Sequence, residues 1–254
     1  MISSLHGRIT NVITQGVPTD QPAEGNQARP GRARRTRGQS AGLDLARIVA
    51  AARSLEPGAI TMQAVADVLG VDRSAINNHV ANKDALLRDV ALDVFAESFA
   101  TVRIGASLSW QDVCRQYASG FADSVIATGP LAQHLVSGAP FQRRVLHAAE
   151  AMLGAMVEGG IDSDTAIRML ALFNNVCLQY AHDHIAALGA EQGPLLTALR
   201  QALKERNSDD FPHLARIAAD LPDVSARTQL DVSVEIIIDG AEAFAGKHGT
   251  HSSK

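Results

Sequence analysis

The chain is poor in cysteine, aromatic residues and long apolar runs. Of its 254 residues 4% are aromatic, and its two cysteines, Cys114 and Cys177, stand far apart in apolar surroundings. We therefore expect two buried, reduced thiols, because no Cys or His spacing typical of a zinc site occurs. No stretch approaches 18 consecutive apolar residues, and residues 1–17 lack the compact apolar centre of a signal peptide. A cytoplasmic protein that does not associate with membranes is expected.

Sequence motifs of catalysis are also missing. There is no glycine-rich phosphate loop, no HExxH pair, and no Ser/His/Asp or Cys/His context of a nucleophile. His182 and His184 are two residues apart, which places their imidazoles on different faces of a helix. We therefore expect no metal site and no cofactor. An all-helical enzyme stays a third hypothesis, which a hydrogen-bonded nucleophile and base in a cavity would revive.

Charge is divided unevenly along the chain. The net charge is −4, but residues 21–90 hold ten Lys and Arg against seven acids, whereas residues 91–254 hold twelve against nineteen. A local excess of cations can attract phosphate even when the whole protein is acidic. A contact with nucleic acid is therefore expected in the N-terminal third.

The first 40 residues carry several prolines and glycines and no helical periodicity, which predicts a disordered arm. Within this arm, residues 29–37 hold five arginines in nine positions. Such an arm can lie on DNA phosphates or enter a minor groove, so Arg35 and Arg37 are candidate DNA contacts. A solvated charge run without function is the alternative.

From residue 41 onward apolar residues recur at helical spacing, and the Ala-rich, aromatic-poor composition also favours helices. The pattern predicts an all-α fold. Four short helices in residues 41–100 would form an N-terminal domain with a three-helix core, and residues 101–247 a larger helical domain before a tail at 248–254. Further helices are expected over residues 110–128, 131–136, 141–157, 163–188, 194–206 and 211–219.

The last element is ambiguous from local composition. Val232–Ile238 is rich in β-branched residues, which favours a strand. However, apolar residues from Leu230 to Ala241 also fit the spacing of a helix face. We predict a helix, because a single strand would have no partner in this chain.

Residues 61–80 have the pattern of a helix-turn-helix. Thr61 is a suitable N-cap for a first short helix, and Gly70 can adopt the left-handed backbone that ends it. In the second helix Ile76 and Val80 are expected to point inward, which leaves polar residues on the outer face. The second helix of such a motif enters the major groove of DNA, so this outer face would meet base edges.

The outer face of the second helix is expected to carry Arg73, Ser74, Asn77 and Asn78. Arginine suits the O6 and N7 atoms of guanine, and asparagine suits the N6 and N7 atoms of adenine. Lys83, at the start of a fourth helix, can reach a phosphate, as can the Thr61 hydroxyl.

The stretch ITMQAVADVLGVDRSAINNHVANKDALL, residues 60–87, resembles the DNA-binding domain of the TetR (tetracycline repressor) family. In that family a Thr-initiated helix, Leu-Gly-Val and a closing His-Val-x-Asn-Lys-x-x-Leu-Leu recur. The resemblance is strong over about residues 43–95. It continues weakly over 211–223 and 234–244, which are similar to the end of the tetracycline-repressor effector domain. It implies a bacterial, nucleoid-associated repressor that a small molecule releases from its operator.

The motif and the resemblance together predict a DNA-binding surface. Its residues are Arg35, Arg37, Thr61, Gln63, Arg73, Ser74, Ala75, Asn77, Asn78, His79 and Lys83. Where this chain has Asn77, the family usually has an aromatic residue that packs against or contacts the DNA backbone. Asn77 cannot supply a ring, so it could contact either a base or a phosphate instead. His79 is either a phosphate contact or a packing residue at the helix end.

The resemblance further implies that residues 105–246 bind a small-molecule effector and form a homodimer. Helices 163–188 and 226–246 of each subunit would build a four-helix interface. A symmetric pair sets two recognition helices roughly 34–36 Å apart, one turn of double-stranded DNA, which implies a palindromic operator.

Polar or polarisable residues within the apolar helices are the effector candidates. They are Tyr117, His134, His147, Met152, Phe173, Asn174, Cys177 and Tyr180. Asn174 is the strongest of these, because a buried amide needs a partner that a ligand can provide. The alternative is a DNA-binding regulator without a small-molecule effector, controlled by a protein partner or by its own concentration.

Overall fold

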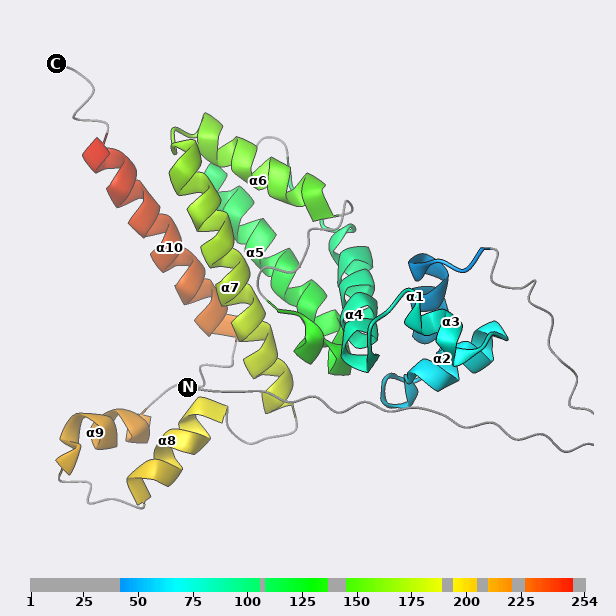
Figure 1. Cartoon of the computed structure of the whole chain (residues 1–254). Helices are drawn as coiled ribbons and strands as arrows, with labels where there is room; N and C mark the ends of the chain where they lie inside the picture. The colour runs from blue at the N-terminus through cyan, green and yellow to red at the C-terminus, as the bar shows by residue number, and fades with distance from the viewer. Residues whose placement is uncertain are drawn as a thin grey trace, which may run out of the picture. The chain divides into compact units, whose positions relative to one another are not determined.

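A computed structural model describes residues 42–105, 108–136, 145–188, 194–204, 210–220 and 227–248 of the chain. Across these ranges the regular secondary structure is helical and no strand occurs, which confirms the all-α prediction (Figure 1). The predicted arm, residues 1–40, and all of the predicted tail except His248 lie outside the described residues. No helix in the described ranges is long and apolar enough to cross a membrane.

Four helices follow one another in the N-terminal part of the described chain. They are α1 (Leu45–Arg53), α2 (Met62–Leu69), α3 (Arg73–Asn77) and α4 (Lys83–Phe99), with a 3₁₀ turn, η1 (Pro57–Ala59), after α1. Three of them begin at a side chain that accepts a hydrogen bond from an amide in the first turn. The acceptors are Asp44 (2.8 Å), Thr61 (3.0 Å) and Asn82 (2.9 Å). Such caps satisfy amides that a helix start leaves free.

Each of these four helices contributes apolar side chains to one core. Ile48, Val65, Ile76 and Leu86, one from each helix, have no exposed surface. The core therefore consists of the inward positions that the helical spacing predicts.

The helix α3 is shorter than the apolar spacing predicts. It ends at Asn77, so Val80 follows the helix and is not part of it. Val80 is still buried, because its amide N–H donates to the carbonyl of Ile76 at 3.0 Å and the chain continues to turn inward.

The remaining helices gather around α5. They are α5 (Trp110–Ala127), the 3₁₀ segment η2 (Gly129–His134), α6 (Leu146–Glu158), α7 (Ser163–Ala187), α8 (Pro194–Lys204), α9 (Pro212–Asp220) and α10 (Arg227–His248). The helix α5 packs against α4, α6, α7 and α10 (Figure 1). These bounds agree with the predicted helices, with one difference: the segment expected at 131–136 is a 3₁₀ helix. The part of the expected helix 141–157 that precedes residue 145 lies outside the described residues.

Aromatic rings fill the junction between α4 and α5. Phe99 of α4 meets Tyr117 edge-on at a centroid distance of 5.4 Å, and Phe95 meets Phe121 at 5.0 Å. The helix α4 also packs against α1. The helix α4 therefore packs both against the N-terminal helices and against the helices that surround α5.

The last element, α10, settles the ambiguity between strand and helix. Its buried residues, Leu230, Val234, Ile238 and Ala241, recur at three- and four-residue intervals. A strand would instead bury every second residue. The β-branched residues of Val232–Ile238 therefore belong to a helix with one buried and one exposed face, and they do not pair as a strand.

Candidate nucleic-acid interface

The turn between α2 and α3 sets the angle at which the two helices meet. Gly70 adopts a left-handed backbone with φ of 66°, a conformation that residues other than glycine rarely adopt. The amide N–H of the next residue, Val71, donates to the carbonyl of Ala66 at 3.0 Å, which closes the end of α2. With Ile76 and Val80 buried against the core, α3 presents its opposite face outward. The predicted helix-turn-helix geometry is therefore formed.

The outward face of α3 carries the polar residues that the sequence predicts there. Arg73, Ser74, Asn77 and Asn78 are all exposed. Within the part of the chain that the structure describes, none of these four side chains forms a hydrogen bond or an ion pair. By contrast, Arg53 of α1, Arg115 of α5 and Arg227 of α10 are paired with carboxylates. The α3 face thus offers donors and acceptors that no described residue uses.

The neighbouring candidates fall into two groups. His79 and Lys83 are exposed, with Lys83 as the first residue of α4, so both remain suited to phosphate contacts. Thr61 is exposed, but its hydroxyl already accepts the N-cap hydrogen bond. The side-chain amide of Gln63 donates to Asp67 at 2.8 Å.

Three further residues complete the predicted DNA-binding surface: Ala75, Arg35 and Arg37. Ala75 is half-buried and packs against the apolar core, so its side chain lies on the inner half of α3. Arg35 and Arg37 lie outside the described residues.

An ion-pair bridge joins α1 to α4. The guanidinium of Arg53 donates to Asp93 at 2.7 Å and also to Glu97, one helical turn further along α4. These hydrogen bonds, with Glu97 contributing most, raise the pKa of Arg53. The bridge ties the helix-turn-helix core to α4 on its exposed side, and the sequence analysis missed it. Asp93 and Glu97 share one face of α4, but nothing local indicates their partner on α1.

The predicted effector residues are mostly enclosed between helices. Tyr117, Met152, Phe173, Cys177 and Tyr180 are buried. The hydroxyl of Tyr117 donates to the side-chain oxygen of the half-buried Asn174 at 2.8 Å, and the Cys177 thiol donates to the carbonyl of Ala118 at 3.4 Å. The predicted partner for the Asn174 amide is thus supplied by the protein.

The two candidate histidines lie elsewhere. His134 is half-buried in η2, and His147 is exposed in the first turn of α6. Neither contacts the Tyr117–Asn174 pair in any hydrogen bond among the described residues. Among the eight candidates, the hydrogen bonds between described residues join only Tyr117 and Asn174.

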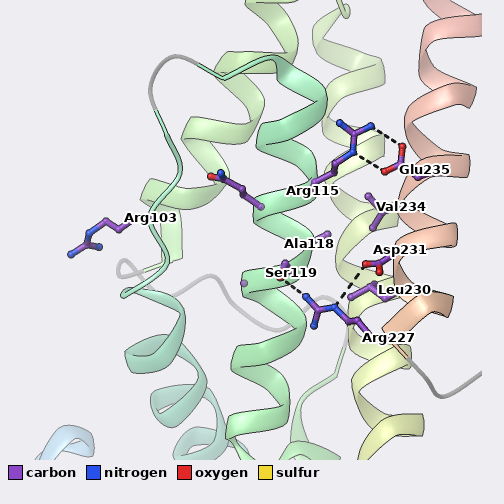
Figure 2. A pocket seen from close by; sticks show the side chains of 11 residues that line it. Arg103, Arg115, Ala118, Ser119, Arg227, Leu230, Asp231, Val234 and Glu235 are labelled. Carbon is purple, nitrogen blue, oxygen red and sulfur yellow. Dashed lines mark hydrogen bonds and ion pairs between the residues drawn. The ribbon is translucent and has the colours of Figure 1, made fainter.

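A groove of about 490 Å³ runs between α5 and α10, and ion pairs line it (Figure 2). Arg115 of α5 holds Glu235 of α10 through two parallel bonds of 2.7 Å each. Near the start of α10, Arg227 donates to Asp123 at 2.6 Å and also to Ser119. The hydrogen bond from Arg115 lowers the pKa of Glu235. None of the eight predicted effector residues lines this groove.

Comparisons with known proteins agree with this geometry. No family model matches the chain. Over 158 residues, 59% of this chain and 72% of the relative, the sequence is 28% identical to the tetracycline repressor protein class D of Escherichia coli. The crystal structure of a possible TetR family transcriptional regulator from Streptomyces coelicolor A3(2) matches with a TM-score of 0.63 and 22% identity. That match covers 79% of this chain and all of the other. The chain is thus similar to tetracycline repressors in sequence and to TetR family proteins in fold.

A further similar structure contains a ligand. The Streptomyces coelicolor TetR family protein ActR, solved in complex with actinorhodin, matches with a TM-score of 0.62 and 22% identity, over 82% of this chain and 99% of ActR. The match shows that this chain shares the fold of a protein that accommodates a small molecule.

Exposed apolar side chains also lie on two adjacent helices, and we call this set of residues the α7–α10 surface. Its residues are Ile167 and Leu172 of α7 and Val232, Ile236 and Phe244 of α10, with between 47% and 66% of each residue exposed. The two helices pack against each other, and their other faces are buried. These are the helices predicted to dimerise.

Proposed function

We propose that this chain is a TetR family regulator, that it binds a palindromic operator as a homodimer, and that a small-molecule effector releases it. The proposal rests on the α3 face, where four exposed side chains have no hydrogen-bond or ion-pair partner among the described residues: Arg73, Ser74, Asn77 and Asn78. Four polar side chains that neither stabilise the fold nor pair with each other are suited to base edges in a major groove.

The α7–α10 surface supports the homodimer. Monomeric proteins rarely leave contiguous large apolar side chains exposed, and a self-complementary helix pair buries them when two copies meet about a two-fold axis. Such a dimer would present two α3 helices to one face of DNA. The operator is then expected to be an inverted repeat with half-sites about one helical turn apart.

Release by a small molecule is supported by the position of α4. This helix is tied to α1 by Arg53 and to α5 by the contact between Phe99 and Tyr117. A ligand that favours one arrangement of the α5–α7 core would therefore bias the position of the helix-turn-helix. The ratio of the ligand's affinities for the two arrangements limits how far it can shift the population from one to the other.

Selection of bound sequences from random duplex DNA tests the DNA-binding part. We expect an inverted repeat from the wild-type protein and a loss of sequence preference from Arg73→Ala. Arg216→Ala is the matched control, because Arg216 is an exposed arginine on α9 without a partner among the described residues. Enrichment of no sequence by the wild-type protein would contradict the proposal.

Sedimentation at a series of protein concentrations tests the dimer. We expect Ile236→Asp to shift the protein towards monomers, because the substitution adds a charge to the α7–α10 surface. The control is Val68→Asp, which changes an apolar residue of similar exposure on α2. An unchanged dimer in Ile236→Asp would show that this surface is not the interface.

The effector part is tested by titrating the protein–operator complex with actinorhodin and with tetracycline and measuring operator affinity. We expect a compound of this polycyclic class to lower operator affinity without unfolding the protein. If a broad panel leaves robust operator binding unchanged, the alternative holds, in which a protein partner or the protein's own concentration controls binding.

A further inference from the structure

A groove of about 700 Å³ lies between α1 and α4. The α1 residues that line it are Leu45, Ala46, Val49, Ala50 and Arg53. The first four have apolar side chains that cannot form hydrogen bonds, whereas the guanidinium of Arg53 reaches two carboxylates on α4. Along this groove the two helices are separated by open space, and the ion pairs of Arg53 connect them.

These ion pairs, which we call the Arg53 bridge, have a defined direction. Arg53 is the last residue of α1, and its acceptors, Asp93 and Glu97, stand one helical turn apart on α4. A planar guanidinium that serves two carboxylates is held more firmly than one with a single partner. Asp93 is ten residues from Lys83, the first residue of α4, which is about 15 Å along the helix. The bridge therefore acts on α4 away from the end that is suited to phosphate.

The buried side of α1 supplies a second attachment to α4. Ile48 and Ala52 have no exposed surface and belong to the core that α4 also joins. The helix α1 packs against α2 as well, and α2 packs against α3. One attachment would allow α1 to rotate about it, whereas two attachments at different places fix the angle. The Arg53 bridge therefore helps to set the angle between α3 and α4.

We propose that the Arg53 bridge makes the dimer selective for one spacing between the two half-sites of its operator. This inference rests on the proposed function, because spacing has a meaning only for a dimer on an inverted repeat. One base pair added between the half-sites moves them apart by about 3.4 Å and rotates one against the other by about 34°. To reach both half-sites, a subunit has to change the angle between α3 and α4, which the intact bridge opposes. Arg53 is thus a positioning residue that acts through α1.

The free energy of the bridge limits how much selectivity it can supply. The exposed fractions of the side chains are 34% for Arg53, 26% for Asp93 and 60% for Glu97, so water screens the pairs in part. For ion pairs of this kind, breaking one bridge should weaken binding by up to about fivefold. A dimer on a lengthened operator meets this penalty once for each subunit that reorients.

The test compares two duplexes by fluorescence anisotropy: the operator selected from random DNA, and the same operator with one base pair inserted at its centre. We expect the wild-type protein to prefer the selected duplex. Arg53→Gln should lower this preference by up to about fivefold for each reorienting subunit, mainly because the variant binds the lengthened duplex more tightly. Arg53→Lys should have an intermediate preference, since an ammonium can pair with a carboxylate but lacks the planar fork.

A second substitution and its matched control lie on α4. Glu97→Gln removes one acceptor of the bridge and should lower the preference in the same direction as Arg53→Gln. Asp89→Asn removes the same charge from the same groove, one turn before Asp93, but Asp89 is not an acceptor of Arg53. It should keep the wild-type preference. Because both variants change the charge near DNA equally, their difference reports the bridge alone. Urea unfolding shows that each variant is folded.

The outcomes separate this inference from the proposed function. A reduced preference in Arg53→Gln and Glu97→Gln, with the wild-type value in Asp89→Asn, supports the positioning role. Equal binding of both duplexes by the wild-type protein, an unchanged preference in Arg53→Gln, or an equal loss in Asp89→Asn overturns it. In those cases the proposed function stands, because the wild-type protein has selected an inverted repeat. Selection of no inverted repeat would overturn the proposed function, and the role of the bridge with it.

Discussion

Replacement of Arg73 by alanine should remove sequence preference while leaving the fold intact. Arg73 is exposed and has no partner among the described residues, and it is the first residue of α3. Its loss should therefore change the free energy of unfolding by no more than about 0.5 kcal/mol. A bidentate contact from arginine to guanine discriminates against the wrong base by about 1–3 kcal/mol, which is about 5- to 140-fold in affinity.

A dimer carries Arg73 twice, so the two half-sites together should lose about 2–6 kcal/mol if the contacts are independent. The assay is fluorescence anisotropy with the selected duplex and with a scrambled duplex, at one fixed salt concentration, since affinity for DNA depends strongly on salt. Arg216→Ala should leave both affinities nearly unchanged. An Arg73→Ala variant that still prefers the selected duplex by the wild-type ratio would refute the assignment of α3 as the reading helix.

Four further outcomes are expected. Lys83→Ala should weaken all duplexes to a similar degree and flatten the salt dependence of binding, because a phosphate contact carries no sequence information; a selective loss for the operator would contradict this role. Tyr117→Phe should lower the free energy of unfolding in urea by about 0.5–1.5 kcal/mol, since the half-buried Asn174 loses its donor but water can replace it. The lowered pKa of Glu235 means that its pair with Arg115 stabilises the fold above pH 4.5, the ordinary pKa of the side chain, and is lost as the pH falls through the lower folded value. Because both side chains are almost half exposed, Glu235→Gln should remove less than about 1 kcal/mol at neutral pH, and urea curves of the variant and wild type should converge in acid. Burial raises the pKa of both cysteine thiols to about 12, so a thiol reagent at neutral pH should react slowly with the native protein and rapidly in denaturant; fast native labelling would show that a thiol is accessible.

The helix-turn-helix could be predicted from the sequence because its determinants are local. The Thr61 cap, the left-handed Gly70 and the inward Ile76 lie within 16 residues of one another, and together they orient α3. Once Ile76 is buried, helical geometry places Arg73 and Asn77 on the outside. The side chain of Ala75 was predicted as a contact, but the same geometry turns it towards the core.

The effector candidates were less predictable, because amino-acid type indicates a polar group in an apolar helix but not what satisfies it. Asn174 was predicted to need a partner, and the partner is Tyr117, 57 residues away. Both residues were on the candidate list, but only the packing of α5 on α7 brings them together.

Sequence alone determined the helices, the Thr61 cap and the outward face of α3, because helical hydrogen bonds and a repeat near 3.6 residues depend on neighbours in the chain. Only the tertiary structure decided that Arg53 meets carboxylates 40 residues later and that Arg115 meets Glu235, 120 residues later. The side-chain pairs between distant helices follow from how the helices pack, and many sequences with the same periodicity would pack differently.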